Sequence, residues 1–263
     1  MTSHVTSGVF SGNGVPVRPK KMADIVAGRI RRMIARGEVT DGQWLPTEPQ
    51  LMAEFGVSRP TLREAFRLLE ADSLVSIRRG PPGGARVTIP GPEAAAAQFG
   101  MLLTLSGTTL ADIYEARMTI EPAAARAIAE RGTAADRKQL AELLEEVRAA
   151  ADAGRSVDRM IVRFHQSLVE LSGNRTLATV TGMLNEIITR HIEQVFADAR
   201  EPAEEVAANT KRALRAYERL VDLVDARDGE GAEKFWTRHM KAARPYVLKG
   251  GTQGATQVVD LLY

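Results

Sequence analysis

The chain has 263 residues, no cysteine and a formal net charge of +2. At roughly 150 residues per domain, this length predicts two compact units. The absence of cysteine excludes a disulfide framework, a thiolate zinc site and a cysteine nucleophile. The longest apolar stretch, residues 94–105, contains Gln98 and Thr104 and is shorter than the roughly 20 residues of a bilayer span. We therefore expect a soluble cytoplasmic protein with no membrane partner.

The charge is unevenly distributed along the chain. Residues 1–90 contain 13 Lys or Arg against 8 acidic residues, a net +5, whereas residues 91–263 contain 22 against 25, a net −3. A basic first third followed by a mildly acidic remainder is typical of a nucleic-acid reader joined to a sensor or assembly domain. Residues 1–20 are rich in Ser, Thr and Gly and lack the pattern of a secretory signal, so we expect a disordered arm there.

Three helices are predicted in the first unit. Apolar residues at helical spacing predict a first helix that stops at Gly37. Thr47 is a good N-cap for a second helix over residues 48–55, and Ser58 is a good N-cap for a third over residues 59–72. Two helices joined by a three-residue turn are typical of a helix-turn-helix.

After Leu74 the apolar period changes from that of a helix to that of a strand. Residues 75–77 and 86–89 are predicted to form two short strands on either side of a glycine-rich loop. A helix-turn-helix followed by such a hairpin predicts a winged helix-turn-helix domain over residues 21–90.

Prolines at the end of this domain separate it from a second unit, in which helical periodicity continues almost to the end. About seven helices are predicted there: 93–105, 109–131, 134–153, 156–172, 176–199, 203–226 and 230–248. Each has an apolar stripe suited to the core of an antiparallel bundle. The predicted fold class is therefore mainly α, with an all-α domain over residues 91–248 and a flexible tail over 249–263.

The third helix and the hairpin contain side chains suited to DNA. Short hydroxyls and long bidentate donors in the first turns of a helix reach phosphates and guanine edges, and glycine in the loop allows close approach of the backbone to a phosphate. The DNA-binding candidates are Ser58, Arg59, Thr61 and Arg63 on the helix and Arg78, Arg79 and Gly80 at the hairpin. A solvated basic helix face is the alternative for the helix alone, but two converging basic elements favour DNA.

Residues 41–48 (DGQWLPTE) and 55–65 (FGVSRPTLREA), followed by Leu74-Val75, resemble the GntR family of bacterial transcription regulators. The resemblance implies that a homodimer binds a palindromic double-stranded DNA operator. It also implies that DNA is read by residues of the candidate set: Ser58, Arg59, Thr61, Arg63 and the wing pair Arg79-Gly80. Pro49 departs from the pattern, because relatives often have there an Arg that contacts the DNA backbone.

The second unit resembles the FadR subgroup of this family, whose all-helical FCD domain binds small ligands. The matching landmarks are Asp112, residues 117–121 (RMTIE), Phe164-His165, residues 172–174 (SGN) and residues 238–240 (RHM). A helix at 93–105 ahead of these landmarks is typical of the seven-helix version of the domain. The whole resemblance covers about residues 20–248 and implies an effector-binding and dimerisation domain.

The resemblance also raises the question of a metal. The family's common metal site uses one Asp and three His, and His165 and His239 stand in the first and last His positions. Ile161 and Tyr217 replace the Asp and the second His, so we predict that no metal is required. A divalent metal held by His165, His191 and His239 is the alternative, because His191 lies on an apolar stripe that faces the bundle.

Arg117 lies on an apolar stripe, which directs its guanidinium into the bundle, where it needs an anion. Glu121, one turn later, is the internal candidate, and the carboxylate or acyl group of an effector is the other. The predicted effector site consists of Tyr114, Arg117, Glu121, Ile161, His165, His191, Tyr217, Trp236 and His239. Because Ile161 and Tyr217 replace polar ligands, we predict a largely apolar effector, such as a fatty acid or its acyl thioester.

The sequence contains no hydrolase, metalloprotease, phosphate-loop or dinucleotide signature, so we predict that the protein is not an enzyme. The predicted function is that of a nucleoid-associated transcription regulator, a repressor whose DNA binding responds to an effector. Two alternatives stay open: a metal-dependent sensor of small acids in the same family, and an architectural DNA protein without an effector. The latter would coat DNA rather than protect discrete palindromes.

Overall fold

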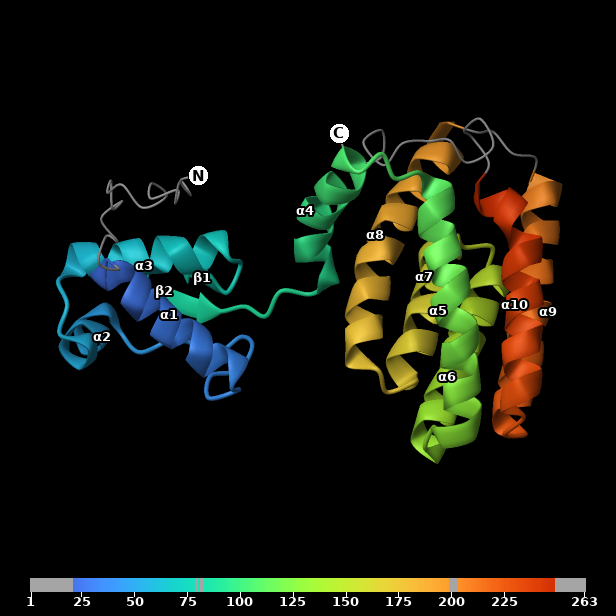
Figure 1. Cartoon of the computed structure of the whole chain (residues 1–263), viewed down its shortest axis with the longest axis horizontal. Coiled ribbons are helices and arrows are strands. Elements are labelled where there is room, and N and C mark those ends of the chain that lie inside the picture. Colours follow the sequence, from blue (N-terminus) through green and yellow to red (C-terminus); the bar gives the residue numbers. More distant parts are fainter. Residues whose placement is uncertain (1–20, 79, 81–82, 199–202, 249–263) are drawn as a thin grey trace, which may run out of the picture. The chain divides into compact units, whose positions relative to one another are not determined.

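The computed structural model of the chain describes residues 21–78, 80, 83–198 and 203–248. The chain divides into two compact units, one ending at Pro90 and the other beginning at Gly91 (Figure 1). The predicted arm 1–20, the predicted tail 249–263 and the wing residue Arg79 lie outside the described residues. None of the described helices is long and apolar enough to cross a membrane.

The first unit is a winged helix-turn-helix, as predicted. Its elements are α1 (Met22–Ala35), α2 (Glu48–Phe55), α3 (Arg59–Ala71), β1 (Val75–Arg78) and β2 (Gly84–Val87). The two strands pair antiparallel, with Val75 opposite Val87 and Arg78 opposite Gly84. The second strand begins two residues earlier than predicted, because its limit is set by backbone pairing, which side-chain alternation does not report.

The turn between α2 and α3 follows from its local sequence. Thr47 forms a capping box with Gln50 at the start of α2. Gly56 ends that helix in the left-handed conformation, at φ +64°, which glycine adopts without the steric cost of a Cβ. Ser58 then caps α3 by accepting a hydrogen bond from the backbone of Thr61. These caps fix where the recognition helix begins.

A short segment before α2 fastens the hairpin to the helices. The backbone N–H of Leu45 donates to Ala85 over 2.9 Å, and that of Val87 donates to Gln43 over 2.8 Å. The buried side chains beneath the hairpin and the helices form one core: Val26, Ile30, Leu51, Leu62, Phe66, Leu69, Val75 and Val87. The wing is therefore held on the same apolar core as the recognition helix.

The second unit is an all-α bundle, and its described residues form seven helices. They are α4 (Pro92–Leu105), α5 (Leu110–Arg131), α6 (Ala134–Asp152), α7 (Asp158–Leu171), α8 (Arg175–Asp198), α9 (Ala203–Asp225) and α10 (Gly229–Val247). The boundaries agree with the predicted ones to within two residues. Thr109 and Thr133 explain two of them, because each closes a capping box with an Asp three residues later.

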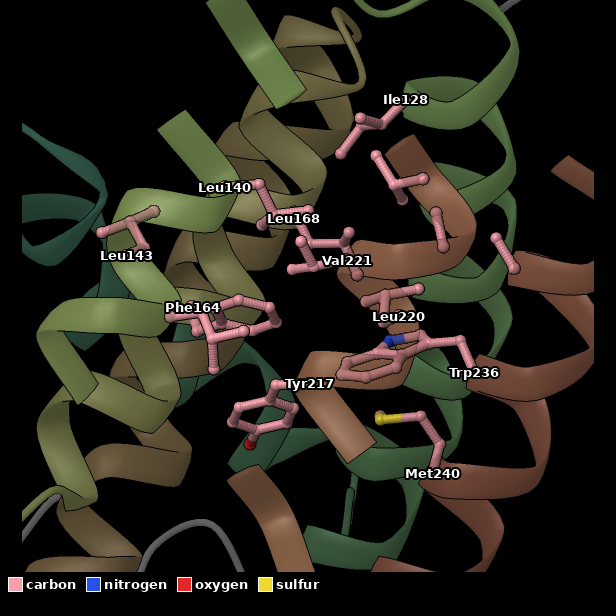
Figure 2. Packing of buried hydrophobic residues seen from close by; sticks show 14 of the residues in the cluster. Ile128, Leu140, Leu143, Phe164, Leu168, Tyr217, Leu220, Val221, Trp236 and Met240 are labelled. Atoms are coloured by element: carbon pink, nitrogen blue, oxygen red, sulfur yellow. The ribbon is translucent and has the colours of Figure 1, made fainter. Parts of the chain in front are cut away.

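The core of the bundle is apolar at one end and polar at the other. Leu140, Leu168, Leu220 and Ile128 lie together within the cluster of buried side chains (Figure 2). Tyr217 lies beyond them, with its hydroxyl oxygen directed away from the apolar cluster (Figure 2). Hydrogen bonds link Tyr217 at this end to His165, and His165 to Glu121.

Candidate DNA-binding surface and effector cavity

Helix α3 has one apolar face and one basic face. Leu62, Phe66 and Leu69 are buried in the core of the first unit. Arg59 and Arg63 lie on the exposed part of the helix, and 55% and 62% of their side chains are accessible to solvent. Both guanidinium groups are therefore accessible to a large ligand such as DNA.

Glu48 contacts both of these arginines, which the sequence did not predict. Its two carboxylate oxygens lie 3.4 Å from Arg59 Nε and 3.6 Å from Arg63 Nε. Glu48 is the first residue of α2, so the turn between the helices brings its carboxylate to the start of α3. The ion pairs are exposed, and such pairs contribute only about 0–1 kcal/mol, so a DNA phosphate can replace the carboxylate at small cost.

The remaining DNA-binding candidates lie at the start of α3, at the end of β1 and in the loop that follows β1. Ser58 and Thr61 share a hydrogen bond of 2.9 Å between their hydroxyls. Arg78 is exposed at the end of β1, and Gly80 adopts a positive φ of +87° in the loop that follows. Arg79 lies outside the described residues, so its side chain is not placed.

The second unit contains a cavity of about 550 Å³ between α5, α7, α8, α9 and α10. This volume is within the range of about 300–1,000 Å³ that holds small-molecule ligands. Seven of the nine predicted effector residues line it: Tyr114, Arg117, Ile161, His165, His191, Tyr217 and His239. Glu121 and Trp236 do not line it and lie behind the wall, where they hold lining residues in place.

Glu121 is the centre of a buried network that joins three helices. Arg117 on α5 donates from Nε to Glu121 Oε1 over 2.7 Å, and its Nη2 lies 2.7 Å from the same oxygen. His165 on α7 and Trp236 on α10 contact the other oxygen, Oε2, at 2.5 Å and 3.0 Å. Of the two sequence-based candidates for the partner of Arg117, the internal carboxylate is therefore present.

The network keeps Glu121 ionised. Burial by itself raises the pKa of this carboxyl, but the charges of Arg117 and His165 and the hydrogen bonds from His165 and Trp236 outweigh burial and lower its pKa to about 2. The negative charge of Glu121 compensates the positive charge of Arg117, so the buried pair is electrically balanced.

His165 connects the network around Glu121 to Tyr217 in the cavity wall. Its Nδ1 donates to the Glu121 carboxylate, and its Nε2 lies 3.1 Å from the hydroxyl oxygen of Tyr217. Tyr217 also stacks on Phe164, with ring centroids 4.4 Å apart. Burial raises the pKa of Tyr217, so its hydroxyl stays protonated. The rings at this end of the cavity have fixed positions.

His239 completes this end of the cavity. Its ring stacks on Trp236 at a centroid distance of 4.6 Å and lies 6.3 Å from the ring of His165. Burial, with a further contribution from His165, lowers the pKa of His239 to about 4 against the opposing effect of Glu121. At neutral pH the imidazole is uncharged and offers one N–H donor.

The lining does not fit a metal site of three ligands. Both ring nitrogens of His165 are engaged, by Glu121 and by Tyr217, and Nε2 of His191 lies 3.2 Å from the carbonyl oxygen of Val247. In the part of the chain that the structure describes, no group of three His, Cys, Asp or Glu is placed to hold an ion. That the protein requires no metal stays a prediction.

The lining also contains polar residues that the sequence analysis did not select. They are Asp158, Glu205, Asn209, Thr210, Arg212 and Tyr246. A signal for one of them was present, because Asn209 precedes Ala213 and Tyr217 at intervals of four residues and so shares a helix face with a predicted site residue. The signal was weak, because the predicted stripe was selected for apolar residues.

Comparison with known proteins identifies both units. Residues 22–87 match the family of bacterial regulatory proteins called the gntR family, and residues 112–242 match the FCD domain. The chain is 29% identical over 231 residues to the HTH-type transcriptional repressor NanR of Citrobacter rodentium, covering 86% of this chain and 85% of that protein. It is 28% identical over 239 residues to NanR of Klebsiella aerogenes, covering 88% of each.

A solved structure shares the fold. The GntR protein of Streptococcus agalactiae superposes with a TM-score of 0.67 at 22% identity, covering 85% of this chain and 99% of that one. The matching families and relatives are transcription regulators, not enzymes. The recognition-helix motif, the winged fold and the helical cavity domain agree with these matches, and the chain belongs to the GntR family of bacterial regulatory proteins, with an FCD domain as its second unit.

Proposed function

We propose that the protein is a transcription repressor that binds a palindromic operator as a homodimer and releases it when a small carboxylic acid enters the cavity. Its similarity to repressors named NanR supports the repressor role. As a DNA-binding protein it acts at the nucleoid in the cytoplasm. Membership of the FadR subgroup is part of this proposal and is supported by the FCD match.

DNA reading is assigned to α3 and the wing. Arg59 and Arg63 form bidentate contacts with guanine edges, while Ser58 and Thr61 contact phosphates at the start of the helix. Arg78, Arg79 and Gly80 contact the backbone or the minor groove. Exposure of Arg59 and Arg63 on the free protein supports this assignment.

The chemistry of the cavity supports an anionic, largely apolar effector. Arg117 lines the cavity and uses Nε and Nη2 on Glu121, so its Nη1 remains as a donor, and the neutral ring of His239, which also lines the cavity, adds a second N–H. Charge-assisted hydrogen bonds of this kind recognise a carboxylate. Of the two acyl classes expected from the sequence, the free fatty acid matches these donors, because a thioester has no carboxylate.

The observation that carries this proposal is that the buried residue Arg117 lies in the wall of the cavity. Its test begins with selection of operator sequences from random duplex DNA and measurement of binding by fluorescence anisotropy. Decanoate at millimolar concentration is then expected to release the operator from the wild type. The Arg117→Met protein is expected to stay bound to the operator in the presence of decanoate. The Arg126→Met protein, which lacks an exposed arginine of the same helix, is expected to release the operator as the wild type does.

Three results would contradict the proposal in different ways. Equal affinity for all duplexes would favour the architectural alternative. A stoichiometric divalent ion that is lost on His165→Ala, together with release by a small hydroxy acid and not by decanoate, would favour the metal-dependent sensor. A monomer of residues 91–263 in micromolar ultracentrifugation would contradict dimerisation through the helical domain.

A further inference from the structure

One side chain of the cavity wall has a polar group that the protein itself does not satisfy. Asn209 on α9 lines the cavity, and its amide nitrogen Nδ2 is buried without a hydrogen-bond partner. Four other buried side-chain atoms in the described part of the chain lack a partner, on Thr104, Thr181, Asn185 and Arg244. None of these four residues lines the cavity, so the unpaired group of Asn209 is the one that a bound ligand can reach.

The orientation of the Asn209 amide is fixed by its neighbour. Arg212 donates from Nη2 to Asn209 Oδ1. A guanidinium has donors and no acceptor, so the amide oxygen must face Arg212 and the NH₂ group must be the end that is left unpaired. The unsatisfied group is therefore a donor, and its complement is an oxygen with a lone pair.

The unpaired donor lies well separated from the anion-binding end of the cavity. Tyr217, which contacts His165 at that end, is eight residues along α9 from Asn209, and at 1.5 Å per residue the two levels are about 12 Å apart. Ala213 lines the cavity one helical turn from each of these two residues, so a small apolar side chain lies between the two polar positions. With carbon–carbon bonds of about 1.5 Å, an extended zigzag chain of about ten carbons spans this distance.

We infer that the effector is a carboxylic acid with a second oxygen acceptor, a hydroxyl or carbonyl group about ten carbons from its carboxylate, which accepts a hydrogen bond from Asn209 Nδ2. This inference rests on the proposed carboxylate-binding function and specifies the ligand class further. A terminal methyl leaves the buried amide unpaired. A terminal ammonium has no lone pair with which to accept a hydrogen bond from the amide.

The test compares three acids of equal length on the full chain by isothermal titration calorimetry: decanoate, 10-hydroxydecanoate and 10-aminodecanoate. The wild type is expected to bind 10-hydroxydecanoate about five to ten times more tightly than decanoate, and 10-aminodecanoate no more tightly than decanoate. Asn209→Ala is expected to bind the hydroxy acid and decanoate equally. The control is Asn185→Ala, which removes a buried asparagine that does not line the cavity and is expected to keep the wild-type preference.

The possible failures are distinguishable. Binding of decanoate and 10-hydroxydecanoate with equal affinity by the wild type would overturn this inference and leave the carboxylate function intact. A preference that survives Asn209→Ala would assign it to another residue and would also overturn the inference. If none of the three acids binds, the proposed carboxylate function fails and this inference fails with it.

Discussion

The protein contains the same chemical pair, arginine with glutamate, in two opposite settings. On the recognition helix, Arg59 and Arg63 share Glu48, and all three side chains are in contact with solvent. In the bundle, Arg117 and Glu121 are buried, with 4% and 0% of their side chains exposed. The exposed contact is weak enough to be exchanged for a phosphate, whereas the buried one must stay formed for the bundle to be stable.

The largest effect is expected for Glu121→Gln. Removing one partner of a buried pair leaves an uncompensated charge on Arg117, which costs about 3–5 kcal/mol in the free energy of unfolding. Urea denaturation of the full chain at pH 7 measures this loss. Glu130→Gln, an exposed pair on the same helix, is the control and should change stability by less than about 1 kcal/mol.

The pH dependence of the Glu121→Gln effect gives a second check. The pKa of Glu121 falls from 4.5 in the unfolded chain to about 2 in the folded one, so its ionised form stabilises the fold fully above pH 4.5. That contribution is lost as the pH falls toward 2. The stability difference between the two proteins should therefore shrink over this range; a constant difference would show that the charge of Glu121 is not what stabilises the bundle.

Arg59→Ala tests the exposed half of the comparison. Loss of a bidentate contact with guanine should weaken operator binding by about 1–3 kcal/mol and flatten sequence preference, as anisotropy titrations measure. The free energy of unfolding should stay within about 0.5 kcal/mol of the wild type, because Arg59 is exposed. Unchanged operator affinity would remove Arg59 from the DNA-reading set.

The titration of His239 should be measurable as a pH dependence of the free energy of unfolding of the helical domain alone. The pKa of His239 is 6.5 in the unfolded chain and about 4 in the folded one, so between these values the unfolded state binds the extra proton and stability falls as the pH falls. From pH 6.5 to pH 5 the loss is about 1.6 kcal/mol at 1.36 kcal/mol per pKa unit, since the histidine of the unfolded chain is already half protonated at pH 6.5. His239→Phe, which keeps a ring beside Trp236, should lose less over the same range; an equal loss would assign the pH dependence to other groups.

The smallest effect is expected for Glu48→Gln. Its carboxylate competes with DNA phosphates for two guanidinium groups, so its removal should raise DNA affinity at low salt by less than tenfold. Glu64→Gln, which removes an exposed partner of Arg67 on α3, is the matched control and should have a smaller effect. A fall in affinity would show instead that Glu48 is needed to orient Arg59 and Arg63.

Local chemistry explains why the fold was predictable from the sequence and the network was not. Thr47, Ser58, Thr109 and Thr133 mark the beginnings of helices through bonds to residues three positions away, so they can be recognised in the sequence. The contact between Arg117 and Glu121 is equally local, and it was among the candidates.

The contacts that the sequence analysis missed are long-range. Trp236 reaches Glu121 across 115 positions and His165 reaches it across 44, so their placement behind the wall depends on how three helices pack. Asn209 could be assigned to a face but not to an unpaired donor, because that property depends on every neighbour at once. The contact of Glu48 with both recognition arginines likewise requires the turn geometry.

The convergence of three donors on one carboxylate has an evolutionary consequence. A replacement of Glu121 alone removes the hydrogen-bond partner of Arg117, His165 and Trp236 at the same time. A replacement of any one of these donors removes a hydrogen bond to an oxygen of Glu121. The network is thus constrained to change as a set or not at all. Wall positions such as Ile161 and Asn209 are not tied to it and can vary one at a time. Descendants of this chain can therefore acquire new ligands by small steps in the wall while the interior behind it is inherited unchanged.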